Sequence, residues 1–291
     1  MSENNIRPND YVTVTQTNHV VEVQYMLKHN NKANIKKLDK DTYLDLSTGE
    51  IKEFNHIENR QQSYNSLRQT FKKLRYLINN NFVGRDNELH ITLTYADNMT
   101  DTKRLYTDFN RFMMRLKRKY KNDTTIDYIS VIEPQKRGAW HVHMLIKFND
   151  LTSVFVKNSD LAALWGQGFV NIKKIKGVDN IGAYLSAYLT DIELDNDTVL
   201  KALDEKREIA EKVVDGETKK FVKGGRLHMY PSGMNLYRKS KGIVFPERKK
   251  MTYENAKKVV KFGEPNYSKT YEIDTDDFKN VITFEQYNTK R

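Results

Sequence analysis

The sequence predicts an α+β fold, in which a central antiparallel sheet of about five strands has helices packed on it. The middle of the chain contains segments in which polar and apolar residues alternate, a pattern typical of strands. Between them lie segments whose apolar residues recur at helical spacing. From residue 86 to residue 195 the segments run strand, helix, strand, strand, helix, strand, helix. This order favours a ferredoxin-like or RRM-like sheet with its helices on one face.

The first strand and the first helix of this order have clear patterns. The segment ELHITLTYA, residues 88–96, alternates apolar and polar positions and should form a half-buried strand. Residues 101–121 follow as a helix with one apolar stripe. That stripe consists of Leu105, Phe109, Phe112 and Leu116.

The later elements are predicted from shorter segments. The segment IDYISVIEP indicates the second strand, and Gly138 marks the turn into a third strand, WHVHMLIKF. The segment SDLAALWG indicates a short helix that is capped by Ser159 or Asp160. The segment GFVNIKKI is the fourth strand, and VDNIGAYLSAYLTDIEL is the last helix.

The sequence suggests three parts along the chain. Residues 1–85 form an N-terminal accessory segment, with one or two strands at YVTVTQTNHVVEVQYML and a helix at SYNSLRQTFKKLRYLINNNF. Residues 86–195 form the core, and residues 196–291 form a C-terminal helical and basic extension. Around the junction, residues 191–211 carry eight acids against three bases and indicate a solvated helix.

Composition limits the class of protein. Lys and Arg outnumber Asp and Glu by 49 to 38, and this net charge of +11 favours a polyanionic partner, with nucleic acid ahead of anionic membrane. The sequence shows no apolar run that would span a membrane and no signal peptide. It has no cysteine, which excludes disulfides and thiolate metal sites and favours a cytoplasmic location.

The run KRGAWHVHMLIKF contains candidate metal ligands. His141 and His143 are two residues apart and therefore share one face of the strand. If the hairpin pairs residue 133 with residue 141, Glu133 lies across from His141, with about 5 Å between their Cβ atoms. Two imidazoles and a carboxylate suit a divalent metal such as Mg²⁺ or Mn²⁺ that acts as a Lewis acid. In the alternative interpretation both are partly exposed strand residues; the other histidines lack such partners.

The helix near residue 184 contains a pair of tyrosines. Tyr184 and Tyr188 in NIGAYLSAYLTD are one helical turn apart and are therefore neighbours. Tyr184 lies at the edge of the predicted apolar stripe, where a phenol can pack its ring and still present its hydroxyl to a site on the sheet. Tyr188 lies closer to the centre of the stripe. Taken alone, aromatic residues at helical spacing are more often core than catalytic.

Together these motifs resemble the HUH endonucleases, the nicking enzymes that initiate rolling-circle replication of plasmids, phages and small single-stranded DNA viruses. The resemblance covers about residues 86–192. The strand ELHITLTYAD resembles the first motif of the family, HVH matches its His-hydrophobe-His motif, and YLSAY resembles its tyrosine motif. Two tyrosines four apart are similar to the two-tyrosine branch among phage initiators. Some initiators carry a third metal ligand at the position of Glu133.

The chain departs from the family pattern beside the tyrosines. Members often show a lysine directly before the second tyrosine and another three residues after it. This chain has Ala187 and Asp191 at those positions. A lysine one turn from the nucleophile would hold phosphate or stabilise the phenolate. The departure either weakens catalysis or places the cation on another residue.

The resemblance implies a function for the tyrosines and the metal ligands. Tyr184 would attack a DNA phosphate beside a metal held by Glu133, His141 and His143. The products would be a 5′-phosphotyrosine and a 3′-OH that primes DNA synthesis. Tyr188 would be a second nucleophile or a structural residue. The implied partner is single-stranded or origin DNA in the cytosol of a bacterial host, and a host helicase is a candidate further partner.

Two basic stretches are candidates for binding the DNA backbone. Between residues 103 and 121 there are eight basic residues and one acid, and between 219 and 250 there are ten basic residues and one acid, with tyrosines among them. The alternative interpretations are a solvated helix face and a disordered solubilising segment. The candidate nucleic-acid-binding residues are Lys103, Arg104, Arg111, Arg115, Lys136, Arg137, Arg226, Arg238, Lys239 and Lys241.

Three other functions remain open from the sequence. The first is a non-catalytic origin-binding replication protein on the same scaffold. The second is a mobilisation relaxase or a transposase with the same chemistry, although relaxases usually carry their tyrosine near the N-terminus. The third is a basic RNA-binding module with incidental histidines, which predicts no dependence on metal.

Overall fold

The computed structural model describes residues 6–29, 34–54, 64–135, 138–175, 181–182, 192–193, 209–214, 217–222, 229–231, 234–275 and 278–290. The chain divides into two compact units. One unit is formed by both ends of the chain, Met1–Ile57 and Pro246–Arg291, and the other by Glu58–Phe245. Antiparallel sheets and helices make up the units, so the predicted α+β class is confirmed.

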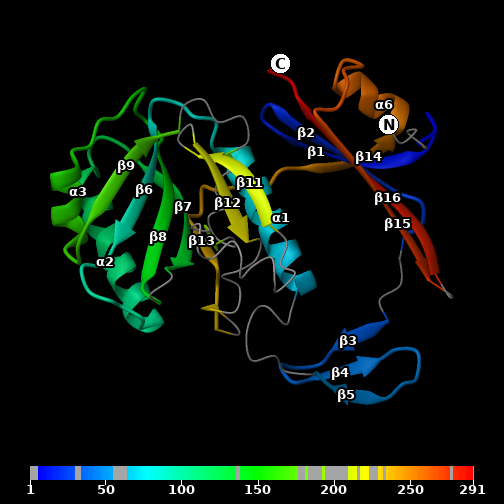
Figure 1. Cartoon of the computed structure of the whole chain (residues 1–291), viewed down its shortest axis with the longest axis horizontal. Coiled ribbons are helices and arrows are strands. Elements are labelled where there is room, and N and C mark those ends of the chain that lie inside the picture. The colour runs from blue at the N-terminus through cyan, green and yellow to red at the C-terminus, as the bar shows by residue number, and fades with distance from the viewer. Residues whose placement is uncertain are drawn as a thin grey trace. The chain divides into compact units, whose positions relative to one another are not determined.

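The Glu58–Phe245 unit contains the predicted five-stranded sheet (Figure 1). Its strand order is β13-β7-β8-β6-β9, and every neighbouring pair is antiparallel. Without β13, the order along the chain is the β-α-β-β-α-β of a ferredoxin-like sheet. The strands are Glu88–Thr94 (β6), Ile126–Pro134 (β7), Trp140–Phe148 (β8), Val170–Lys174 (β9) and Tyr237–Lys239 (β13).

Helices cover both faces of this sheet. The helices α2, Thr102–Lys119, and α3, Asn158–Trp165, pack on the face that carries the apolar residues of β6 and the even-numbered apolar residues of β8. The helix α1, Tyr64–Asn81, packs on the opposite face, where Ile129, Val131 and Leu145 are buried. The expectation that all helices lie on one face was wrong. It failed because this second face is itself apolar beside α1 and needs a cover.

Local signals in the sequence explain where these elements begin and turn. Asp101 caps α2 by accepting hydrogen bonds from the backbone N–H of Lys103 and Arg104. The expected cap of α3 was wrong, because α3 already begins at Asn158 and has Lys157 as its N-cap with no side-chain hydrogen bond. Gly138 occupies the β7–β8 turn with φ 86°, a conformation that favours glycine.

The unit formed by the two chain ends contains a second five-stranded sheet, in the order β14-β1-β2-β16-β15. The strands predicted near residues 11–27 are confirmed as β1 and β2. A short helix, α6, packs with the valines of β1 and β2. The elements are Tyr11–Thr17 (β1), Val20–Met26 (β2), Arg248–Thr252 (β14), Tyr253–Val259 (α6), Tyr267–Thr275 (β15) and Phe278–Asn288 (β16).

Two small sheets complete the described elements. The sheet β3-β4-β5 is formed by Ile35–Lys37, Thr42–Asp45 and Ile51–Glu53, and the sheet β10-β12-β11 by Ile192–Glu193, Glu217–Val222 and Ile209–Val214. Residues 192–193 and 209–211 are therefore strands and not the predicted solvated helix, whose remaining residues fall largely outside the described ranges. The three-part division expected from the sequence stays a prediction, and the two compact units divide the chain at other residues.

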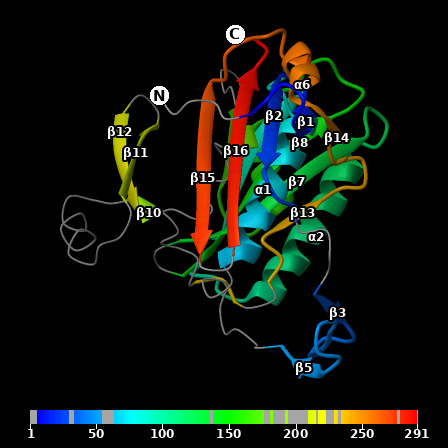
Figure 2. The same ribbon diagram turned by 90° about the vertical axis from the view of Figure 1, so that its right-hand side faces the viewer.

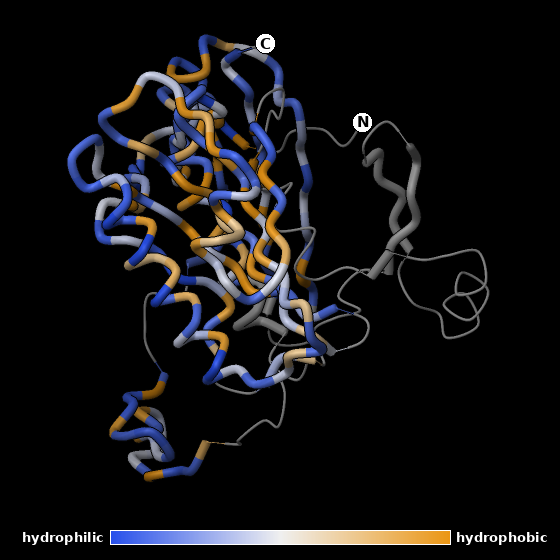
Figure 3. The backbone as a smooth tube through the Cα atoms, turned by 90° about the vertical axis from the view of Figure 1, so that its left-hand side faces the viewer, coloured by the Kyte–Doolittle hydropathy of each residue, from blue (hydrophilic) through white to orange (hydrophobic). Residues whose placement is uncertain are grey.

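Hydropathy along the chain agrees with these layers (Figure 3). In the Glu58–Phe245 unit, hydrophobic and hydrophilic residues alternate along the strands, and the two core clusters lie on the two faces of the sheet. Among the described residues, no helix is long and apolar enough to cross a membrane.

Candidate functional site

The β7–β8 hairpin sets the geometry of the site. It pairs Glu133 with His141, which is the register that the sequence interpretation assumed. The turn is closed by backbone hydrogen bonds from Gly138 N to Gln135 O, 2.9 Å, and from Gln135 N to Ala139 O, 2.8 Å. Because residues two apart point to the same side of a strand, His143 lies on the same face as this pair.

Glu133, His141 and His143 form a compact group of possible metal ligands. One ligand atom from each residue lies within 4.8 Å of the other two. Glu133 and His143 are both 7% exposed, and His141 is partly exposed. Burying a carboxylate costs free energy unless a partner or a cation compensates its charge. Two imidazoles and one carboxylate are a donor set that divalent metals accept, so the residues fit the metal predicted from the sequence.

The ring of His143 is held from both of its nitrogen atoms. Its Nε2 contacts Oε2 of Glu133, and its Nδ1 lies 3.2 Å from the hydroxyl of Thr92 on β6. If Nδ1 donates its hydrogen to Thr92, the lone pair of Nε2 faces the carboxylate and is available to a metal. Thr92 is therefore in position to fix the tautomer of His143.

A third histidine belongs to the same face of the sheet. The ring of His90 on β6 stacks on His143, with 5.6 Å between centroids and an interplanar angle of 28°. Within the described part of the chain, the buried Nε2 of His90 has no hydrogen-bond partner. The expectation that the other histidines lack partners of this kind was wrong for His90. The alternation of ELHITLT placed His90 and Thr92 on one face, but only the β6–β8 register brings that face beside His143.

Burial keeps these imidazoles neutral near neutral pH. Burial lowers the pKa of His90 to about 3, and the nearby His143 and Lys173 lower it further in the same direction. Burial also lowers the pKa of His143 to about 4. A neutral imidazole has the free lone pair that a metal ligand requires.

The edge strand β9 adds a cation to this face that the sequence interpretation did not single out. β9 pairs with β6 so that Lys173 lies beside His90 and Asn171 beside Thr92. Both β9 side chains are exposed. Lys173 therefore stands on the same face as the Glu133–His141–His143 group, two strands away from β8.

The helix predicted to carry the tyrosines begins on the same face. Ile181 is 2% exposed and packs in the cluster that contains Val131 and Leu145. The backbone N–H of Gly182 donates to Oδ1 of Asn79 on α1 at 2.8 Å. A Cβ atom at Gly182 would meet the carbonyl oxygen of Arg75 at 2.7 Å, so this close approach requires glycine. Tyr184 and Tyr188 lie outside the described residues.

Four of the predicted DNA-binding residues lie on α2, which covers the other face of the sheet. Lys103 is exposed, whereas the three arginines contact other residues of the unit. Arg104 and Arg111 approach the buried carboxylate of Asp108 at 3.4 and 3.8 Å, and Arg115 donates to the carbonyl oxygen of Leu164 at 3.0 Å. DNA bound along α2 would therefore lie across the sheet from the candidate metal ligands.

The remaining predicted DNA-binding residues are divided. The guanidinium of Arg238 lies over the ring of Tyr106 at 3.9 Å, and Lys239 donates to the carbonyl oxygen of Ile243 at 2.7 Å. Lys241 is exposed. Lys136, Arg137 and Arg226 lie outside the described residues. The predicted cations that the structure describes are therefore not gathered on the face that carries the candidate metal ligands.

The part of the chain that carries this face matches a known family. Residues 88–193 match the family of the replication-associated protein ORF2 and the gene 2 protein. The match spans β6 through β9, all three candidate metal ligands and both tyrosines. No curated protein matches the chain. The match supports a replication-associated protein and agrees with the replication initiator that the sequence motifs resemble.

Proposed function

We propose that this chain is a metal-dependent single-stranded DNA nickase and strand transferase that initiates rolling-circle replication. The observation that carries the proposal is the pairing of Glu133 with His141 across the hairpin, beside His143, inside the segment that matches a replication-associated family. Burying this carboxylate among imidazoles costs free energy that a bound divalent cation would offset. The DNA substrate would be a single-stranded origin in a bacterial cytosol, with a host helicase as a candidate partner.

The metal would be held by the carboxylate of Glu133 and the imidazoles of His141 and His143. When bound, Mg²⁺ or Mn²⁺ would supply Lewis-acid neutralisation of the charge that develops on the scissile phosphate. The neutral state of His143 and its contact with Thr92 keep the ligand atoms oriented for this task.

The chain itself would supply the nucleophile. The hydroxyl oxygen of Tyr184 attacks the phosphorus atom, the bond from phosphorus to the 3′-oxygen breaks, and the phenolic proton is released to the leaving oxygen or to water. The products are a 5′-phosphotyrosine and a free 3′-OH. Because one phosphoester replaces another, the joined strand can be released later without ATP. Tyr188 would act as a second nucleophile or would pack in the core.

A covalent-adduct assay tests the proposal. The full chain is incubated with Mn²⁺ and a labelled single-stranded origin oligonucleotide, and the products are run on a denaturing gel. We expect a protein–DNA band that disappears with chelator and in Tyr184→Phe, while Tyr184→Phe still binds the oligonucleotide. The matched variant Tyr188→Phe separates the two tyrosines. Full adduct formation by Tyr184→Phe would remove Tyr184 from the mechanism.

One observation favours a second candidate, a non-catalytic origin-binding protein. Ala187 and Asp191 replace lysines that the nicking enzymes often carry beside the tyrosines. Lys173 on β9 could supply the missing cation to the same face. Absence of any covalent band, with origin binding retained, would favour the binding protein.

A further inference from the structure

The sheet of the unit formed by the chain ends has two unlike faces. One face carries Val14, Val23 and Tyr287, which are buried together with Ala256 of α6. Because neighbours along a strand point to opposite sides, the residues between them form the second face, which we call the open face. Its members include Tyr11, Lys250, Tyr267, Lys269, Tyr271 and Phe284.

One row of paired residues crosses the open face from edge to edge. Lys269 on β15 pairs with Phe284 on β16, Phe284 with Gln24 on β2, Gln24 with Thr13 on β1, and Thr13 with Lys250 on β14. The row therefore has a lysine at each edge of the sheet and an aromatic ring beside one of them. Figure 2 shows β15 at the edge, next to β16.

The neighbouring rows add exposed aromatic side chains. Tyr271 pairs with Ile282, which pairs with Met26, and Tyr267 begins the row on the other side of Lys269. Tyr11, Tyr267 and Tyr271 are 68%, 52% and 37% exposed. Large aromatic rings that stay exposed on a sheet face indicate a binding surface more than a structural one.

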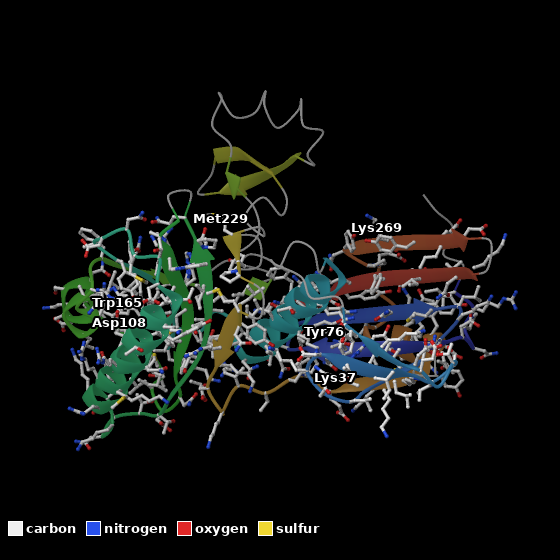
Figure 4. All side chains as sticks on the ribbon, turned by 90° about the horizontal axis from the view of Figure 1, so that it is seen from below. Lys37, Tyr76, Asp108, Trp165, Met229 and Lys269 are labelled. Atoms are coloured by element: carbon white, nitrogen blue, oxygen red, sulfur yellow. The ribbon has the colours of Figure 1, made fainter. Side chains whose placement is uncertain are left out.

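The exposed charge of the open face is positive. Lys269, Lys250 and Arg248 are exposed on it, whereas its acid Glu22 is only 8% exposed. The ammonium group of Lys269 lies 4.8 Å from the centroid of the Tyr271 ring, and that ring meets Phe284 edge-on at 6.1 Å. Figure 4 labels Lys269 on β15. Cations and aromatic rings are thus interleaved on one surface.

We propose that the open face binds single-stranded nucleic acid. Lysine and arginine at the sheet edges would contact phosphates, and bases would stack on Tyr11, Tyr267 and Tyr271. Charge complementarity favours this polyanion over an acid-poor protein partner or a second copy of this chain, whose own open face is also basic. The proposal does not depend on the metal ligands of the other unit, so the chain would hold a strand at a second place away from the nicking chemistry.

Binding of the full chain to a short fluorescein-labelled oligodeoxynucleotide tests the proposal by fluorescence anisotropy, in EDTA so that no nicking occurs. We expect the pair Tyr267→Thr/Tyr271→Thr to bind about tenfold more weakly, since each stacked base contributes substantially to affinity. We expect Lys250→Ala/Lys269→Ala to bind more weakly and to lower the slope of log K against log salt by about 1.4. Threonine keeps the strand preference, and circular dichroism verifies folding of each variant.

A matched control removes the same charge elsewhere in this unit. Lys258→Ala/Lys279→Ala takes two exposed lysines from α6 and from the α6 side of β16, and should leave affinity within about twofold of the unchanged chain. Photo-crosslinking with 5-bromodeoxyuridine should place adducts on Tyr267 or Tyr271. An RNA of the same sequence shows whether the sugar is read, and a stronger RNA complex would assign RNA as the ligand of this face.

Three results would overturn the proposal. The first is equal weakening by the control pair, and the second is equally tight binding of duplex DNA, which offers no free base to stack. The third is a change in the monomer–dimer equilibrium of the tyrosine variants without a change in DNA affinity, which would make the open face a contact between copies. A chain that loses binding here but still forms the covalent adduct separates this proposal from the nickase.

Discussion

At the scale of single residues, Thr92 is the most informative side chain. Its hydroxyl lies 3.2 Å from Nδ1 of His143, and the opposite ring nitrogen contacts Glu133. Partners of this kind orient metal-binding histidines, and their loss commonly weakens metal binding about tenfold or more. The role of Thr92 could not be predicted from the sequence, because it depends on the register between β6 and β8.

The predicted effect of Thr92 is on metal affinity. Thr92→Val keeps the shape and removes the hydroxyl, so we expect the Mn²⁺ affinity measured by titration calorimetry to fall about tenfold. Thr92→Ser should restore most of it. Thr94→Val, on the same face opposite His141, is the matched control and should bind Mn²⁺ nearly normally. Equal affinities for Thr92→Val and the unchanged chain would show that Thr92 does not orient His143.

His90 should make stability depend on pH. Its pKa is lowered by burial to about 3, so between about pH 6.5 and 4 the unfolded chain takes up a proton at this residue that the folded chain does not. Its contribution to stability is therefore present above about pH 6.5 and is lost as the pH falls. His90→Phe keeps a ring against His143 and removes this titration.

We expect the unfolding free energy of His90→Phe to gain on that of the unchanged chain by about 1.4 kcal/mol per pH unit in this window. Urea denaturation without metal at about pH 7.5, 5.5 and 4.5 measures the difference. A difference that stays constant with pH would mean that His90 is not kept neutral by its surroundings.

At the scale of elements, the hairpin and the helices differ in how well the sequence predicted them. The alternation in β7 and β8, together with Gly138, was enough to predict strands, a turn and a shared face for Glu133, His141 and His143. The register was assumed and is confirmed. The position of α1 was not predicted, because its amphipathic pattern shows that one side is buried but not which surface buries it.

Gly182 shows why the start of the next helix is tightly placed. A Cβ atom there would approach Arg75 O at 2.7 Å and Oδ1 of Asn79 at 2.9 Å. We expect Gly182→Ala to lower the unfolding free energy by about 1–3 kcal/mol, because the backbone must move to relieve this overlap. It should also reduce covalent adduct formation, since the predicted tyrosine helix begins at this point. Unchanged denaturation and unchanged adduct yield would contradict the placement.

At the scale of the whole molecule, the order of segments predicted the α+β class and the central sheet but not the organisation into units. β1 and β2 pair with β14 and β16, which lie at the other end of the chain. Alternating patterns state that a strand has a buried face, not which distant strand it pairs with. The basic stretch near residue 250 was predicted as an extension, and its residues Arg248–Thr252 instead form an edge strand.

The central claim is that Glu133, His141 and His143 bind one divalent metal. Titration of the purified chain with Mn²⁺ tests it directly. We expect one ion per chain, with the unfolding free energy raised by about 2.7 kcal/mol at roughly a hundredfold excess over Kd. Both effects should vanish in Glu133→Gln/His143→Gln and persist in the exposed control pair Glu247→Gln/His29→Gln. Equal Mn²⁺ affinity and equal stabilisation in the Glu133→Gln/His143→Gln variant would contradict the claim.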